Sequence, residues 1–210
     1  HHQITTNSDL AQKFFDQGLR LVYAFNHEEA IAAFTEASRL DPDAPMPYWG
    51  VALSLGPNIN AAMDPKVEPR AVEAMQKATA RLSQATARER AYVEALAARY
   101  SAKKSVTRKA KDEAYAKAMR QVAREAPDDA DAATIAAEAM MVLRPWDYWR
   151  ADGRPQPGTE EILAILEAAL RQHPDHPGAC HYYIHAVEAS LDPPRALDSA
   201  KRSPPLMQGA

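Results

Sequence analysis

The sequence predicts an all-α fold, in which antiparallel helix pairs stack into a curved solenoid of about nine or ten helices. Apolar and small residues recur three or four positions apart along most of the 210 residues, which is the spacing of one helix face. Prolines or polar turn residues close these runs, and no stretch alternates in the way a strand would. We therefore expect a single helical repeat domain over residues 1–210.

The first predicted helix pair occupies residues 9–40. Its first helix begins at Asp9, the predicted N-cap. One face of this helix is apolar or small, at Leu10, Phe14, Gly18, Leu21 and Phe25. The second helix follows His27, which is expected to assist capping. It stops at Pro42, because proline cannot continue a helix.

Capping signals and prolines predict the later helices. Thr86 and Glu89 form a capping box before a helix over residues 87–100, and Thr159 is the predicted cap of a helix over 160–173. Two more helices are expected over residues 129–142 and 176–190. Loops are expected at residues 56–66, 101–109 and 143–158. The tail from residue 193 holds four prolines and predicts no capping helix, so we expect the chain to be the N-terminal part of a longer array.

Small and aromatic residues recur at fixed offsets in the first pair, at Gly18, Ala30, Phe34, Ala37 and Pro42. Small side chains let two helices approach, and the aromatic ring fills the gap between them. This pattern resembles the tetratricopeptide-repeat (TPR) consensus. Tyr48 and Ala52 repeat it one period of about 34 residues later.

Short phrases along the chain are similar to those of a bacterial TPR subfamily. They are residues 23–27 (YAFNH), 48–50 (YWG), 56–58 (GPN), 146–149 (WDYW) and 181–185 (HYYIH). The resemblance covers most of the chain and implies a bacterial TPR protein, either cytoplasmic or periplasmic. Members of this subfamily continue past the end of the present sequence into a further histidine-bearing helix.

TPR proteins bind protein or peptide partners in a concave groove lined by the first helix of each pair. Besides Gln12, the resemblance carries groove positions to Phe15, Leu19, Val22, Tyr23, Met46, Trp49 and Leu53. Because these side chains are apolar or aromatic, we expect an interaction scaffold that docks a hydrophobic segment of a partner. Alternatively, residues 56–66 or a neighbouring helix cover the groove. Exposed repeat ends would favour self-association.

A histidine-rich helix suggests a second function, the binding of zinc or copper. His181, His185 and Glu188 are spaced i, i+4 and i+7, which places them on one stripe of a helix. Helical zinc sites use the same histidine spacing. Tyr182 stands where the zinc-protease motif needs glutamate, so a protease is not predicted. The competing interpretation is structural, with the histidines hydrogen-bonded to Glu188 and to backbone carbonyls.

Other function classes lack support in the sequence. The net charge is −3, whereas nucleic-acid binding needs a basic face. No stretch approaches the ~20 apolar residues of a membrane span. The glycines are scattered, so no phosphate-binding loop is predicted. Cys180 and His181 are adjacent and point about 100° apart on a helix, so they do not form a nucleophile–base pair. No residue pattern directly supports an enzymatic activity.

Overall fold

The computed structural model describes residues 1–100 and 105–207, which form ten α-helices and two short 3-10 helices. The helices are α1 (Asp9–Tyr23), α2 (His27–Leu40), α3 (Pro45–Ser54), α4 (Glu68–Ala80), α5 (Ala87–Ala97), η1 (Ala98–Tyr100), α6 (Arg108–Glu125), α7 (Ala130–Met141), α8 (Thr159–Gln172), α9 (Pro177–Val187), η2 (Pro193–Ala196) and α10 (Leu197–Leu206). Within the described ranges there are two isolated β-bridges and no strand. The all-α prediction is confirmed.

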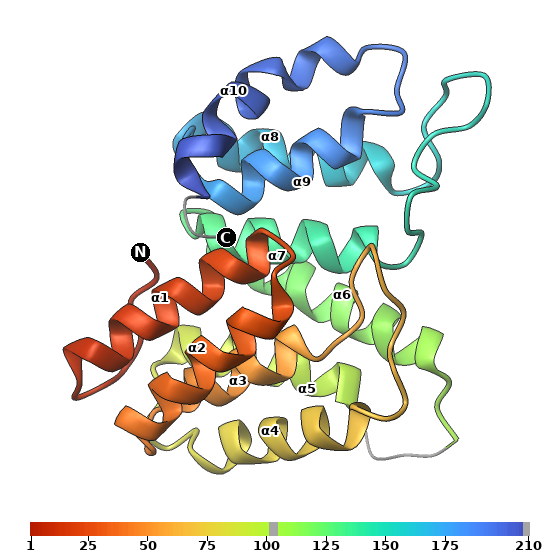
Figure 1. The fold of residues 1–210 in the computed structure, drawn as a ribbon. Coiled ribbons are helices and arrows are strands. Elements are labelled where there is room, and N and C mark those ends of the chain that lie inside the picture. Colours follow the sequence, from red (N-terminus) through yellow and green to blue (C-terminus); the bar gives the residue numbers. More distant parts are fainter. Residues whose placement is uncertain (101–104, 208–210) are drawn as a thin grey trace.

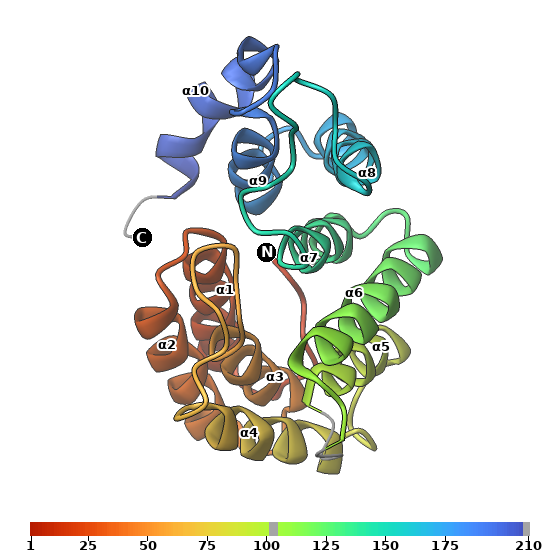
Figure 2. The same ribbon diagram turned by 90° about the vertical axis from the view of Figure 1, so that its right-hand side faces the viewer.

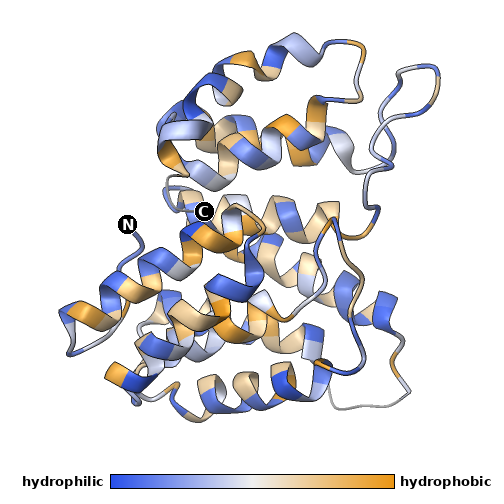
Figure 3. Cartoon of the chain, in the orientation of Figure 1, coloured by the Kyte–Doolittle hydropathy of each residue, from blue (hydrophilic) through white to orange (hydrophobic). Residues whose placement is uncertain are grey.

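Each described helix packs against the next one in the sequence, from α1 and α2 to α9 and α10 (Figure 1). Most connections are short, so neighbouring helices run antiparallel. Apolar and polar residues alternate in bands along the helices (Figure 3), as expected when each helix buries one face. The arrangement is the predicted solenoid of helix pairs.

The solenoid curves strongly enough to bring distant helices together. Helix α1 contacts α9 although more than half of the sequence separates them. Figure 2 shows the chain before α1 running inside the curve formed by α1, α3, α5, α6 and α7. The concave side is therefore narrow, and residues from both ends of the array line it.

Close helix approach in the first repeats depends on two glycines beside one phenylalanine. The Phe34 ring is fully buried. A Cβ atom added to Gly18 on α1 would lie 2.7 Å from this ring, and one added to Gly50 on α3 would lie 2.5 Å from it. Phe34 thus fills the gap between three helices, as the spacing of small residues predicts.

Several local predictions are confirmed. Thr86 and Glu89 form the predicted capping box at the start of α5. Residues 56–66 and 143–158 contain no helix. Of the predicted linker over 101–109, residues 101–104 lie outside the described ranges, and α6 already begins at Arg108. None of the described helices is both long and apolar enough to cross a membrane.

Two predicted N-caps are wrong. Ser8, not Asp9, caps α1, because its side chain accepts a hydrogen bond from the Ala11 amide. Thr159 is the first residue of α8, and the preceding glycine is the N-cap. The Thr159 hydroxyl instead donates a hydrogen bond of 2.7 Å to the Tyr148 carbonyl and ties the 143–158 loop to α8.

The tail is helical, contrary to the prediction. Residues Pro193–Ala196 form η2 and residues Leu197–Leu206 form α10, which packs on α9. Pro193 and Pro194 stand in a first turn, where a missing amide proton costs no internal hydrogen bond. Ala196 and Ser199 are buried, so this segment forms a further helical layer over α9.

Candidate functional site

The concave face of the solenoid is occupied by the first eight residues of the chain, here called the N-terminal segment (residues 1–8). This segment is extended and has no helical turn. It runs inside the curve of the helices before the chain turns back into α1 (Figure 2). Its contacts describe how this face holds an extended peptide.

Gln12 on α1 pairs with the main chain of the N-terminal segment in both directions. Its side-chain oxygen accepts a hydrogen bond of 2.9 Å from the Ile4 amide, and its side-chain nitrogen donates one of 2.8 Å to the His2 carbonyl. This pair of bonds satisfies the same groups that a neighbouring strand would satisfy. Because both bonds go to the backbone, they do not depend on which side chains the segment carries.

Three carboxylates accept further hydrogen bonds from the segment, and they belong to Glu89 on α5, Asp41 directly after α2 and Asp16 on α1. Glu89 accepts from both the amide and the hydroxyl of Thr5, at 2.6 Å each. The carboxylate of Asp41 accepts from the Thr6 hydroxyl at 2.6 Å and from the Asn7 amide at 2.8 Å. Asp16 accepts from the His2 amide at 3.0 Å. Charge-assisted bonds of this kind are stronger than neutral ones.

Two side chains of the segment enter the apolar core. Ile4 is only 3% exposed. The His2 ring lies between two aromatic rings, with its centroid 5.9 Å from that of Phe15 and 5.4 Å from that of Tyr92. The segment is therefore anchored by apolar burial as well as by hydrogen bonds.

The residues predicted to form an open apolar groove are all buried. Phe15, Leu19, Tyr23, Met46, Trp49 and Leu53 are between 0% and 7% exposed. The expectation that this face presents free apolar surface is corrected, because the N-terminal segment and the neighbouring helices cover it. The predicted cover was the 56–66 loop or a neighbouring helix, and sequence reasoning missed the segment that precedes α1. Partner binding by these residues stays a prediction.

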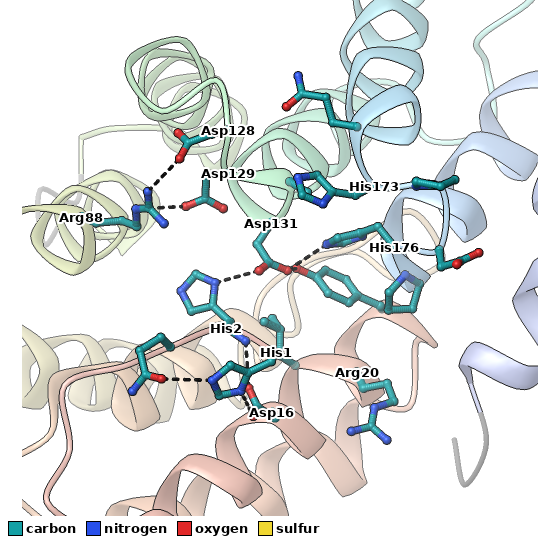
Figure 4. A pocket seen from close by; sticks show the side chains of 18 residues that line it. His1, His2, Asp16, Arg20, Arg88, Asp128, Asp129, Asp131, His173 and His176 are labelled. Atoms are coloured by element: carbon teal, nitrogen blue, oxygen red, sulfur yellow. Dashed lines mark hydrogen bonds and ion pairs between the residues drawn. The ribbon is translucent and has the colours of Figure 1, made fainter.

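A pocket of about 650 Å³ opens beside the N-terminal segment, between α1 and the first turns of α7 and α9 (Figure 4). Its walls carry side chains of both charges. The acidic ones include Asp16, Asp128 and Asp129, and the basic ones include Arg20 and Arg88. Arg88 lies 3.5 Å from an oxygen of each of the carboxylates of Asp128 and Asp129.

Asp131 is the centre of a buried hydrogen-bond cluster in this pocket (Figure 4). One oxygen accepts from His2 at 2.8 Å, and the other accepts from His176 at 3.0 Å and from the Tyr23 hydroxyl. Burial alone would raise the pKa of Asp131, but the bonds from His176 and His2 hold it well below its ordinary value. We call these four residues the Asp131 cluster. It joins the N-terminal segment to α1, α7 and α9.

Three groups in the pocket have the composition of a metal site. His2, Asp129 and Asp131 each bring one ligand atom to within 4.8 Å of the others. However, both Asp131 oxygens already accept hydrogen bonds from neutral donors or histidines. One Asp129 oxygen receives the Ala132 amide and caps α7. The other Asp129 oxygen is buried without a hydrogen-bond partner, with Arg88 3.5 Å away. The bonds to Asp131 join the N-terminal segment to α7 and α9 and so help to close the solenoid.

A second polar cluster is buried where helices from both halves of the array meet. Arg99 is fully buried, 3.2 Å from Asp112, and its guanidinium lies 4.0 Å above the Tyr115 ring. Glu138 and His27 line the same cavity, of about 10 Å³, together with Arg99, and such a volume fits about one water molecule. Burial raises the pKa of Glu138 to about 7, while the nearby Arg99 opposes the rise.

His27 belongs to this cavity and does not cap α2. The N-cap residue Asn26 has no side-chain capping bond, and both ring nitrogens of His27 are buried without a hydrogen-bond partner. Burial lowers the pKa of His27. The sequence prediction of a capping role is wrong, because the ring turns inward.

The fold is TPR-like. No protein-family model and no curated protein matches the sequence. Two solved structures are similar at 16% sequence identity and a TM-score of 0.44. One is described as "MamA RS-1 ArsTM double mutant" and covers 96% of this chain and 96% of its own. The other is "MamA 41-end from Desulfovibrio magneticus RS-1", which covers 98% of this chain and 100% of its own.

In this TPR-like fold, His181 lies in the middle of α9, His185 lies in its last turn and Glu188 is its C-cap, and two of these three predicted metal residues converge. The Nε2 atoms of His181 and His185 are 3.0 Å apart. Glu188 does not face this point, because its carboxylate bonds Nδ1 on the other side of the His185 ring at 2.9 Å. The predicted three-ligand stripe is therefore not formed. Burial lowers the pKa of His181.

Proposed function

We propose that this chain is a protein-interaction scaffold that binds an extended peptide segment along its concave face. The observation that supports the proposal is the N-terminal segment itself, which occupies this face as a peptide ligand would. Its main chain pairs with Gln12, and its Ile4 side chain enters the core. An extended ligand held through backbone bonds, with pockets for alternate side chains, is a common recognition mode.

The contacts define the chemistry of a suitable partner. Its main chain would offer one amide and one carbonyl to Gln12, and a second amide to Glu89. An aliphatic side chain would take the place of Ile4. Hydroxyl-bearing residues would suit the next two positions, where Glu89 and Asp41 accept hydrogen bonds from threonines. The proposed ligand is thus a short apolar-hydroxyl segment, in place of the purely hydrophobic one that the sequence suggests.

A partner would have to replace the N-terminal segment. Phe15 would then contact the ligand directly, because it now contacts the His2 ring. The Tyr23 hydroxyl donates to Asp131, so it could bond to a ligand only if the Asp131 cluster opened. Because the segment must leave first, the apparent affinity for a partner equals the intrinsic affinity multiplied by the fraction of molecules whose groove is open.

A peptide array tests this proposal. Octapeptides with varied residues at the fourth position would be probed with the intact chain and with the variants Ile4→Asp and Gln12→Ala. We expect the Ile4→Asp chain to bind about tenfold more tightly than the parent, because its own segment competes less. Added to Ile4→Asp, where the chain's own segment no longer competes, Gln12→Ala should abolish binding. The control Gln76→Ala, at an exposed glutamine on α4, should leave binding unchanged. Binding that is indifferent to both Ile4→Asp and Gln12→Ala would contradict the proposal.

Self-association is a separate prediction about the surface. Leu191 and Leu197 are 82% and 52% exposed near the start of α10. Exposed apolar side chains at the end of a repeat array favour contact between copies. Sedimentation at several concentrations, with Leu197→Ser as the comparison, would measure it.

A further inference from the structure

The end of helix α9 holds two histidines in an arrangement that a neutral pair does not explain. His181 and His185 are one turn apart, and their Nε2 atoms approach to 3.0 Å. Their ring centroids are 4.7 Å apart. On the far side of each ring, Nδ1 is held by a separate acceptor: the Tyr23 carbonyl at 2.6 Å from His181, and the Glu188 carboxylate at 2.9 Å from His185.

The two outer acceptors assign the tautomers. A carbonyl oxygen only accepts, so His181 carries its proton on Nδ1. An ionised carboxylate also only accepts, so His185 carries its proton on Nδ1 as well. Each neutral ring then presents a lone pair on Nε2, and the two unprotonated nitrogens are only 3.0 Å apart. Two unprotonated nitrogens this close repel each other unless a cation binds both. A zinc ion at ~2.0–2.1 Å from each nitrogen would lie to one side of the line that joins them, because half of their separation is only about 1.5 Å.

The surroundings of the pair are fixed by unusual backbone. Among the described residues, Phe25 and Trp146 are the non-glycine residues with positive φ, at 59° and 62°. Both aromatic rings pack on His185, with centroid distances of 5.9 Å for Phe25 and 5.1 Å for Trp146. Left-handed backbone is costly for such bulky residues, and strain of this kind concentrates at functional sites.

The 143–158 loop is held over the same end of α9. The Trp149 indole donates a hydrogen bond of 2.8 Å to the Ala186 carbonyl. The pair nevertheless stays reachable, because the His185 side chain is 20% exposed. Two aromatic rings and the 143–158 loop therefore surround the end of α9, where the His185 side chain stays partly exposed.

We propose that His181 and His185 bind one zinc or copper ion through their Nε2 atoms. Imidazole nitrogens suit both metals. Metal-bound histidines commonly donate their other ring proton to a carbonyl or carboxylate, which are the roles of Tyr23 and Glu188 here. Glu188 is thus a positioning residue and not the third ligand. Two protein ligands leave further coordination positions of the ion open to water or to an added ligand. This proposal does not depend on the peptide-binding function.

Titration of the metal-free chain with zinc and with copper(I), against a chromophoric chelator, tests the proposal. We expect one equivalent to bind, and His185→Gln to weaken binding at least tenfold. Glu188→Gln should weaken it about tenfold, in the range found for residues that orient a ligand. The matched control is His173→Gln, because His173 is exposed and should bind metal as the parent does. His181→Gln also removes the bond to Tyr23, so His185→Gln is the decisive variant.

A shared proton is the competing explanation of the short contact, and nitrogen NMR of the labelled chain distinguishes the two. Under the proposal, both Nε2 signals of the metal-free chain have the shift of an unprotonated nitrogen, and both move on addition of the ion. An imidazolium proton on either Nε2 at neutral pH, without metal binding, would overturn the proposal. Metal binding that survives His185→Gln unchanged would also overturn it.

Discussion

Replacement of Glu138 by glutamine tests the buried polar centre. Glu138 is 8% exposed and lines the small cavity beside Arg99. Burial raises its pKa from 4.5 to about 7. The folded chain therefore holds a proton that the unfolded chain releases as the pH passes 4.5. In this window, folding favours the protonated side chain, so the free energy of unfolding falls as the pH rises.

The size of the effect follows from the two pKa values. The interval from 4.5 to about 7, at ~1.4 kcal/mol per pH unit, corresponds to on the order of 3 kcal/mol. Glutamine has the shape of the protonated acid and has no proton to lose. Relative to the parent, the Glu138→Gln variant should therefore gain on the order of 3 kcal/mol of stability between pH 4.5 and pH 7.5.

Urea unfolding followed by circular dichroism at several pH values measures this difference. Subtracting the parent's free energy of unfolding from that of the variant cancels the contributions of the other titrating groups, such as Asp131. Glu94→Gln is the matched control, because Glu94 is exposed, and its difference from the parent should be flat across the same range. If the Glu138→Gln difference is equally flat, Glu138 is ionised in the folded chain throughout, and the reasoning from burial fails.

Three further predictions concern stability. Gly50→Ala places a Cβ atom 2.5 Å from the Phe34 ring and should cost about 1–3 kcal/mol by urea unfolding; an unchanged midpoint would mean that α3 shifts freely. Asp131→Asn removes charge-assisted bonds and should cost about 2–3 kcal/mol at pH 7. The pKa of Asp131 lies below its ordinary value, so this contribution to stability is present above about pH 4 and is lost in acid. The free energies of unfolding of parent and variant should therefore converge as the pH is lowered. Thr86→Ala removes the capping box of α5 and should lower the free energy of unfolding by about 1 kcal/mol in urea. An unchanged free energy of unfolding would mean that the start of α5 is already frayed in the parent.

The features that sequence reasoning predicted are local. The approach of α1 and α2 depends on Gly18 and Phe34, which lie within one repeat and obey a fixed spacing. The capping box of Thr86 and Glu89 spans one helical turn. Periodicity and capping chemistry act over such distances, so fold class and most helices could be predicted.

The features that it missed are contacts between distant parts of the chain. Glu89 also holds Thr5, 84 positions away, and Asp131 accepts from Tyr23, 108 positions away. The curvature of the solenoid decides whether such residues meet, and no short pattern encodes it. Gln12, a polar residue between Ala11 and Phe15 on the buried face of α1, is among the predicted groove positions, but its position alone does not identify the segment that it binds.

The histidine helix lies between these two cases. The i, i+4 spacing correctly brought His181 and His185 together. It could not indicate that Glu188 turns to the other ring nitrogen, nor that Tyr23 supplies the carbonyl opposite. Helical spacing gives the stripe on which a side chain lies, whereas its rotamer depends on its neighbours.

Binding of a synthetic peptide in trans tests the central claim most directly. A chain beginning at residue 9 would be mixed with a fluorescent peptide of residues 1–8, and the anisotropy would be recorded as the chain is added. We expect saturable binding of this peptide and none of its Ile4→Asp counterpart, since Ile4 is the buried anchor. Equal binding of the two peptides, or no binding by a shortened chain that keeps its helical circular dichroism, would contradict the account.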